Sequence, residues 1–174
     1  MTGPTLEPTP GQTVGPFFHL GLPFPGDSAL VPAGHPLAVH LRGFVLDGAS
    51  DPVPDALVEL WQAGPDGATV RETGSLHRDG WTFTGWGRAG TDATGRYAFS
   101  TVVPGGPAPF FALVVFARGL TDRLFTRAYL PDAVLPPGIP ESLRAVAEPR
   151  GFRFDIRLQG ENETVFLSFQ KQKP

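Results

Sequence analysis

The sequence predicts an all-β protein built as an antiparallel β-sandwich, with an extended N-terminal arm and one short helix. The 174 residues include 20 prolines and 22 glycines, and long helical periodicity is nowhere evident. Such a composition favours many short strands joined by turns. Turn-forming segments such as 46–55 and 91–95 separate the apolar runs, a spacing that is typical of a sandwich.

The N-terminal region differs in composition from the rest of the chain. Residues 1–36 are rich in proline and glycine with scattered aromatic side chains. We expect them to form an ordered arm that packs on another surface. Residues 37–174 then form the sandwich, as a single domain, because a chain of this length can bury one sizeable core.

Alternation of apolar and polar residues predicts the strands. Between Phe152 and Leu158 every second residue is apolar and the intervening residues are charged, so one face of this strand meets solvent. The same pattern runs from Leu37 to Val45, with His40 on the polar face. Further strands are expected at 55–63, 95–102 and 163–169.

Two segments depart from this alternation. Residues 110–117 are apolar at every position, which predicts a central strand covered on both faces. Residues 140–147 are predicted as the one short helix, because Pro140 or Glu141 stands near their start and Pro149 follows them.

Composition excludes several classes of function. The formal net charge is −3 and no block of like charges occurs, so a nucleic-acid-binding surface is not expected. The chain has no cysteine, which excludes disulfides, thiolate catalysis and sulfur-ligated metals. Neither the first ten residues nor any later stretch predicts a secretory signal or a membrane span, so we expect a cytoplasmic protein with no membrane partner.

The residues that could bind a metal are few and scattered. No pair of them has the one-apart or helical spacing that would bring two ligands to one ion, so a structural role is favoured for each. They are His19, His35, His40, His77, Tyr97 and Tyr129.

Segments along the whole chain resemble the intradiol ring-cleaving dioxygenases, whose sandwich is of a transthyretin-like type. The segment FARG at 116–119 and the tail FDIRLQGENETVFL at 154–167 resemble the alpha subunits of two-subunit members that cleave protocatechuate. The other matching segments are TPGQTVGPFFHLGL (9–22), RGFVLDGASDPVPDALVELWQA (42–63) and FTGWGRAGTDATGRYAFSTVVPG (83–105).

The resemblance implies that this chain has lost the metal site of the family. Catalytic subunits hold a ferric ion with two tyrosinates and two histidines, which suit a hard Lewis-acidic ion that must also bind a catecholate. Thr69 occupies the position of the first tyrosine, and the loop that carries the second is shortened at 105–109. Phe110 and Ala112 replace the histidines. We therefore expect no cofactor on this chain and Fe(III) on a partner beta subunit.

The resemblance also implies a contribution to the partner's substrate pocket. The arm positions that match are Thr13, Gly15, Pro16 and Phe17, of which Phe17 stands where alpha subunits often carry tyrosine. Arg127 matches a family arginine and could pair with the carboxylate of protocatechuate, the substrate that is cleaved with dioxygen. The alternatives are a solvent-exposed proline-rich turn for the arm and an ion pair with Asp132 for Arg127.

Two other functions remain open at this point. One is a standalone transthyretin-like β-sandwich that binds or scaffolds without enzymatic activity. The other is a self-sufficient dioxygenase with a rearranged ligand set, which would need new ligands from the few histidines and tyrosines of the chain.

Overall fold

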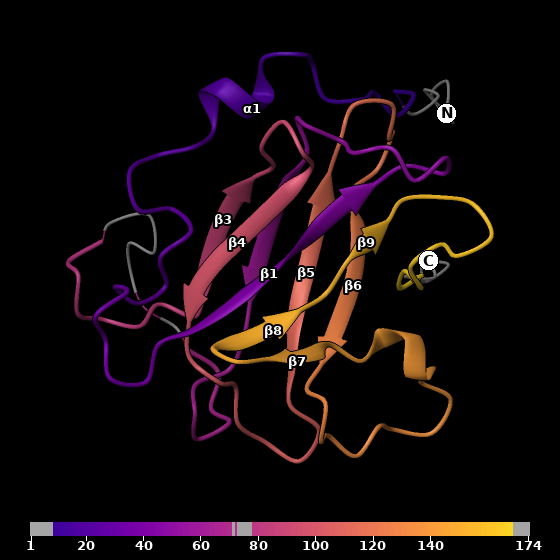
Figure 1. Cartoon of the computed structure of the whole chain (residues 1–174). Helices are drawn as coiled ribbons and strands as arrows, with labels where there is room; N and C mark the ends of the chain where they lie inside the picture. Colours follow the sequence, from indigo (N-terminus) through magenta and orange to yellow (C-terminus); the bar gives the residue numbers. More distant parts are fainter. Residues whose placement is uncertain (1–8, 71, 73–77, 169–174) are drawn as a thin grey trace, which may run out of the picture.

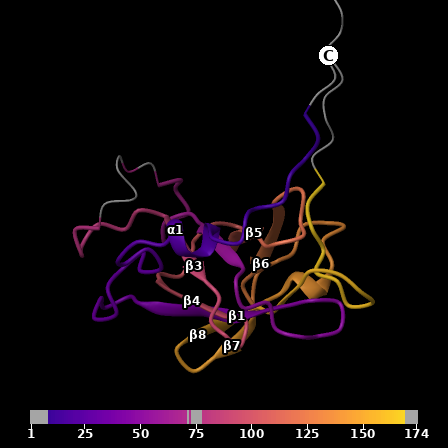
Figure 2. The ribbon, with the colours of Figure 1, turned by 90° about the horizontal axis from the view of Figure 1, so that it is seen from above.

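The computed structural model describes residues 9–70, 72 and 78–168, and these residues fold into a sandwich of two sheets (Figure 1). One sheet has the order β4-β1-β8-β7, with β9 also paired to β1, and the other has the order β3-β2-β5-β6. Figure 2 shows β1, β7 and β8 on one side, with β5, β6 and α1 on the opposite side. The predicted β-sandwich is confirmed.

The five-stranded sheet contains the first and last strands of the domain. Strand β1 pairs antiparallel with β4 but parallel with the short strands β8 and β9, so this sheet is mixed. Its members are β1 (Val39–Leu46), β4 (Arg96–Thr101), β7 (Val146–Glu148), β8 (Gly151–Arg153) and β9 (Ile156–Arg157).

The four-stranded sheet is antiparallel throughout. Strand β5 lies between β2 and β6, as its apolar sequence predicted. The members of this sheet are β2 (Leu57–Trp61), β3 (Trp86–Gly90), β5 (Phe110–Phe116) and β6 (Leu124–Tyr129).

Side chains from both sheets fill one core, because alternate residues of each strand point inward. The predicted inward position of Tyr97 and Phe99 is confirmed, since each is 1% exposed. The Tyr97 hydroxyl donates a hydrogen bond to the Phe154 carbonyl at 2.5 Å, and burial raises the pKa of this phenol far above its usual range. The other large buried side chains of this core include Leu41, Leu60, Phe111, Leu113 and Ile156.

The arm region begins with exposed segments and ends packed on the sandwich. Helix α1 (Phe18–Gly21), which the sequence did not predict, buries none of its residues. Further along, the Phe24 ring stacks on Trp86 at 6.2 Å between centroids. Leu30 is 1% exposed, and its amide donates to the Ser100 carbonyl at 2.8 Å.

The helix predicted at 140–147 is wrong. Only Glu141–Leu143 form a single 3-10 turn, and Val146–Glu148 form β7 instead. Arg144 already has extended backbone angles, and its guanidinium donates to the carbonyls of Pro131 and Ala133 at 2.7 and 2.8 Å. Pairing with β8 therefore overrides the weak local helix preference.

Two strand predictions also need correction near the C-terminus. The run 152–158 is divided into β8 and β9, because the Asp155 carboxylate accepts the hydrogen bond of the Phe44 amide at 3.2 Å. The described part of 163–169 forms no strand. This segment lies beside β6 and is connected to it by individual hydrogen bonds, such as that from the Leu167 amide to the Phe125 carbonyl at 2.7 Å.

Within the described ranges, no helix is long and apolar enough to cross a bilayer.

Candidate functional site

The outer side of the four-stranded sheet carries the positions that the sequence singled out. The register places Trp61, Ala112 and Arg127 in one row across β2, β5 and β6, so their side chains share this side. We call this side the open face. Its middle is hollowed into a cavity of about 460 Å³ lined by Glu59, Trp61, Ala112, Val114, Phe116, Arg123 and Phe125.

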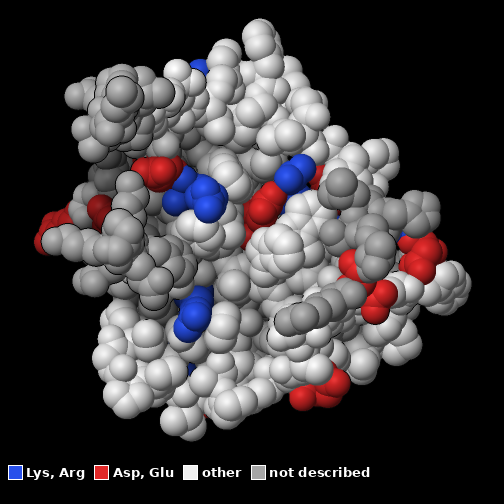
Figure 3. Space-filling view, turned by 180° about the vertical axis from the view of Figure 1, so that it is seen from behind, with Lys and Arg blue, Asp and Glu red and all other residues white. Residues whose placement is uncertain are grey.

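The prediction that β5 is covered on both faces is wrong for three of its outward residues, whereas the fourth, Val114, is buried at 7% exposure. Phe111, Leu113 and Val115 are at most 1% exposed, whereas Phe110, Ala112 and Phe116 are only half-buried. Neighbouring Trp61 is 50% exposed. Figure 3 shows the molecule from this side, where the surface not covered by grey atoms is mostly uncharged and carries a few charged groups.

Arg127 lies against aromatic rings. Its guanidinium carbon is 4.4 Å from the centroid of the Phe110 ring, and Nη1 donates to the Tyr129 hydroxyl at 3.2 Å. The Phe110 and Tyr129 rings are themselves 5.3 Å apart between centroids. Arg127 forms no ion pair with Asp132 or another carboxylate of the described ranges.

The residues that the sequence resemblance matched to iron ligands lie near one end of this face. Phe110 and Ala112 are two residues apart on β5 and point the same way. Thr69 forms an isolated bridge with Ala63, two residues after Trp61. The shortened loop is packed against the Thr69 loop, because the Gly105 amide donates to the Gly64 carbonyl at 2.9 Å.

These side chains do not fit a ferric ion. Phe110 presents a phenyl ring and Ala112 a methyl group, neither of which has a donor atom, and the Thr69 hydroxyl is a far weaker ligand than a tyrosinate. Throughout the described ranges, no group of three or more His, Cys, Asp or Glu side chains could hold a metal ion.

The remaining candidate ligands do not form another site. The Tyr97 and Tyr129 side chains are buried in the core. His19 lies on α1 with its ring 5.9 Å from that of Phe18, and the Nδ1 atom of His35 accepts a bond from the Leu37 amide at 3.2 Å. His40 is exposed on β1, as predicted, and His77 lies outside the described residues.

Comparison with known proteins assigns the family. A family model described as Dioxygenase matches residues 14–112, which is more than half of the chain. The chain is 34% identical to the protocatechuate 3,4-dioxygenase alpha chain of Burkholderia cepacia, over 94% of this chain and 98% of the relative. The chain belongs to the intradiol dioxygenase family.

Two further relatives fit this assignment to the intradiol dioxygenase family. The beta chain of protocatechuate 3,4-dioxygenase from the same organism is 33% identical over 75% of this chain and 69% of its own length. The dioxygenase domain of a carbohydrate-binding fusion protein from Streptomyces sp. SirexAA-E superposes with a TM-score of 0.61 at 26% identity, covering 88% of this chain and 99% of that domain.

The arm residues lie at the C-terminal end of β5. The Thr13 hydroxyl accepts a hydrogen bond from the Gly119 amide at 2.8 Å, in the turn after β5. Gly15, Pro16 and Phe17 follow and are exposed, Phe17 to 75%. A seven-residue strand spans about 20 Å. The structure therefore groups the arm positions with one another but does not bring them to the aromatic neighbours of Arg127.

Trp61 and Phe125 are the site residues that the sequence analysis missed. They lie on the open face beside Ala112 and line its cavity. The alternation of Leu57, Glu59 and Trp61 could have revealed one shared strand face, but only the register with β5 shows that this face is the open one.

Proposed function

We propose that this chain is the alpha subunit of a protocatechuate 3,4-dioxygenase and acts with an iron-bearing beta subunit. The observation that carries the proposal is that Phe110 and Ala112, which the resemblance matches to two histidine ligands, offer no donor atom within an intradiol sandwich. The similarity to an alpha chain over nearly all of its length supports the same subunit.

In the proposed complex, protocatechuate and dioxygen are converted to 3-carboxy-cis,cis-muconate. Fe(III) on the beta subunit supplies Lewis-acid activation of the catecholate when it is bound. This chain contributes no ligand to that ion and acts through its surface. We place the complex in the cytoplasm. Disulfides are rare in that compartment, and this chain has no cysteine with which to form one.

We infer that the arm supplies part of the wall of the partner's substrate pocket. Gly15 has open space around it, with no atom within 4 Å of the position that a Cβ would take. It therefore lets a flat ligand approach the backbone. Pro16 fixes the direction of the chain, and the exposed Phe17 ring offers an aromatic surface. The bond from the Gly119 amide to Thr13 holds the start of this segment.

Arg127 is the proposed partner of the substrate carboxylate, either by direct contact or through the subunit interface. Stacking on Phe110 removes water from one side of the guanidinium, and a charge in such a setting binds a carboxylate more strongly than a fully hydrated one. The absence of a carboxylate partner among the described residues leaves its charge uncompensated. The arm and Arg127 then act as two separate elements.

The open face is the proposed docking surface for the beta subunit. Trp61 is 50% exposed next to half-buried Ala112, and half-buried Phe116 lies further along β5 on the same face. Exposed aromatic side chains beside apolar ones are typical of interface centres. The occupant to which we commit is the beta subunit, because the chain belongs to a family in which an alpha chain and a beta chain are both similar to it.

Co-purification with a tagged beta chain tests the proposal. Trp61→Glu should abolish or strongly weaken association, because it buries a charge in the proposed interface. Trp81→Glu is the matched control, since Trp81 is 84% exposed and lies outside the open face. If the unaltered chain stays monomeric beside the beta chain, it is a standalone sandwich module. Equal effects of both changes would exclude the open face as the interface.

A further inference from the structure

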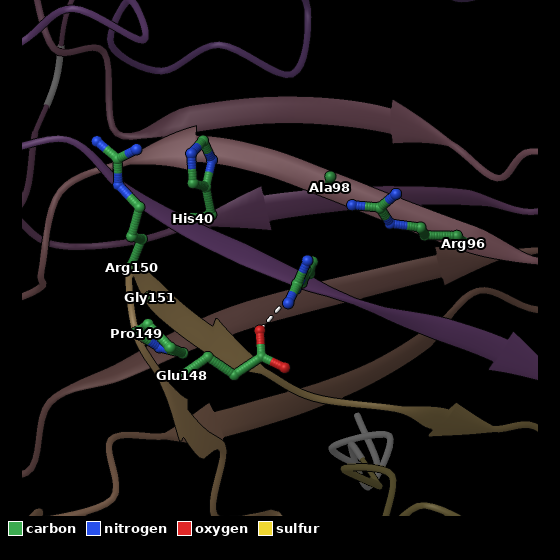
Figure 4. A pocket seen from close by; sticks show the side chains of 8 residues that line it. His40, Arg96, Ala98, Glu148, Pro149, Arg150 and Gly151 are labelled. Atoms are coloured by element: carbon green, nitrogen blue, oxygen red, sulfur yellow. Dashed lines mark hydrogen bonds and ion pairs between the residues drawn. The ribbon is translucent and has the colours of Figure 1, made fainter.

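A second hollow lies on the outer side of the five-stranded sheet, across the sandwich from the open face. It is a cavity of about 500 Å³ over β1, β4 and the β7–β8 turn (Figure 4). Four cationic or basic side chains line it, namely His40, Arg42, Arg96 and Arg150. Figure 4 shows His40 and Arg150 near one end and Arg96 toward the other.

Small residues form the floor of this cavity. Ala98 lies opposite Arg42 in the β1–β4 pair, and Gly151 lies opposite His40 in the β1–β8 pair. A Cβ on Gly151 would be 1.9 Å from the His40 carbonyl oxygen, so a side chain is excluded there. The sheet is thus recessed and apolar between long cationic side chains.

The positive charge of this cavity is only partly compensated. Glu148 is the one carboxylate in its lining, and it accepts a hydrogen bond from Arg42 at 2.6 Å. Among the described residues, neither Arg96 nor Arg150 forms an ion pair within 4.0 Å, although the charge of Arg96 also acts on Asp92. Arg153, which is 3.5 Å from Asp155, lies directly opposite Arg42 across the two strands.

This gathering of charge is unfavourable in the absence of an anion. Like charges opposite one another on paired strands destabilise a sheet. The hydrogen bond from Arg42 lowers the pKa of Glu148, and so do the charges of Arg42, Arg153 and Arg96. Glu148 therefore stays ionised, but the arginine charges around it exceed its single negative charge. This local excess of positive charge occurs on a chain whose formal net charge is −3. An anion bound in the recess would relieve the repulsion.

We propose that this cavity binds a small organic anion, a carboxylate with a flat apolar body. The floor at Ala98 and Gly151 would contact the body, and Arg96 and Arg150 would pair with carboxylates. The recess and the positive charge are both properties of this sheet alone. The inference therefore does not rest on the proposed dioxygenase function.

Calorimetric titration of the full chain with benzene-1,4-dicarboxylate tests this site. The probe has a flat ring and two carboxylates but no hydroxyls. One site per chain is expected, weakened by added salt. Arg96→Gln and Arg150→Gln should each weaken binding about tenfold, as expected for loss of one charge-assisted pair. Ala98→Leu should abolish binding at unchanged charge, because the added side chain fills the recess.

Arg157→Gln is the matched control, since it removes one positive charge from β9, where the guanidinium donates to the Ser50 hydroxyl. It should leave binding unchanged. Absence of binding by the folded full chain would overturn the proposal, and so would equal losses for all three arginine variants. Sulfate binding as tightly as the dicarboxylate, with no effect of Ala98→Leu, would also contradict an organic ligand. Loss of the site only upon addition of the beta subunit would show that a protein covers this face instead.

Discussion

At the residue scale, two positions in one strand are where we propose that this chain departs from the iron-binding members of its family. Phe110 and Ala112 hold no donor atom, yet their neighbourhood keeps a charged group, because Arg127 stacks on Phe110. The sequence identified all three residues through the family resemblance. It could not show that the phenyl ring and the guanidinium would contact one another, since that contact depends on the pairing of β5 with β6.

Arg127 carries the first prediction. In the assembled complex, Arg127→Ala should raise the Michaelis constant for protocatechuate by about ten- to a hundredfold, the effect of losing a charge-assisted pair of about 1.5–3 kcal/mol. The constant for catechol, which lacks the carboxylate, should change far less, and the iron content should stay unchanged. Steady-state kinetics with both substrates measure this. Arg123→Ala, a change on the same open face, is the control.

Equal losses for the two substrates would assign Arg127 to the fold or the interface. No change for either substrate would mean that the carboxylate partner lies on the beta subunit.

The second residue-scale prediction concerns Gly43. A Cβ at this position would lie 1.9 Å from the Phe154 carbonyl oxygen, so Gly43→Ala should lower the free energy of unfolding by about 2 kcal/mol or more. Gly90→Ala is the matched control, because no atom lies within 4 Å of its Cβ position. It should shift stability by less than about 0.5 kcal/mol. Urea unfolding measures both, and equal stabilities would contradict the close approach of β1 to the Phe154 backbone.

At the element scale, alternation predicted four of the longer strands, missed β3 and β6, and failed where tertiary contacts decide. The strands predicted at 37–45, 55–63, 95–102 and 110–117 correspond to β1, β2, β4 and β5. Short elements were missed or mistaken because their local signal is weak. Residues 146–148 pair with β8 rather than continue a helix, and the segment from 163 makes separate bonds rather than a ladder.

The arm is the element whose function is most directly testable. Deleting residues 1–18 should weaken assembly or turnover of the complex, because it removes Thr13, Gly15, Pro16 and Phe17 together. Removing residues 1–8 alone is the control and should have little effect. Sedimentation measures the contribution of the arm to assembly, and activity measurements give its contribution to turnover. A chain shortened by 18 residues that assembles and turns over substrate normally would show that the arm is only a tail.

At the scale of the whole molecule, the sandwich has two outer faces with different chemistry. The open face is largely apolar around Trp61, and the opposite face has a recess surrounded by arginines. Sequence alternation already placed His40 on a polar strand face. It could not bring Arg96 and Arg150 to that face, because they come from segments more than fifty residues apart that meet only through β1.

The central claim is that the chain keeps an intradiol dioxygenase sandwich while the metal belongs to its partner. Elemental analysis of iron, in the purified full chain and in its complex with the beta subunit, tests this claim most directly. We expect no stoichiometric iron and no ring cleavage for the chain alone, and iron in proportion to the beta subunit in an active complex. About one tightly held iron per isolated chain, with cleavage of protocatechuate, would contradict the account.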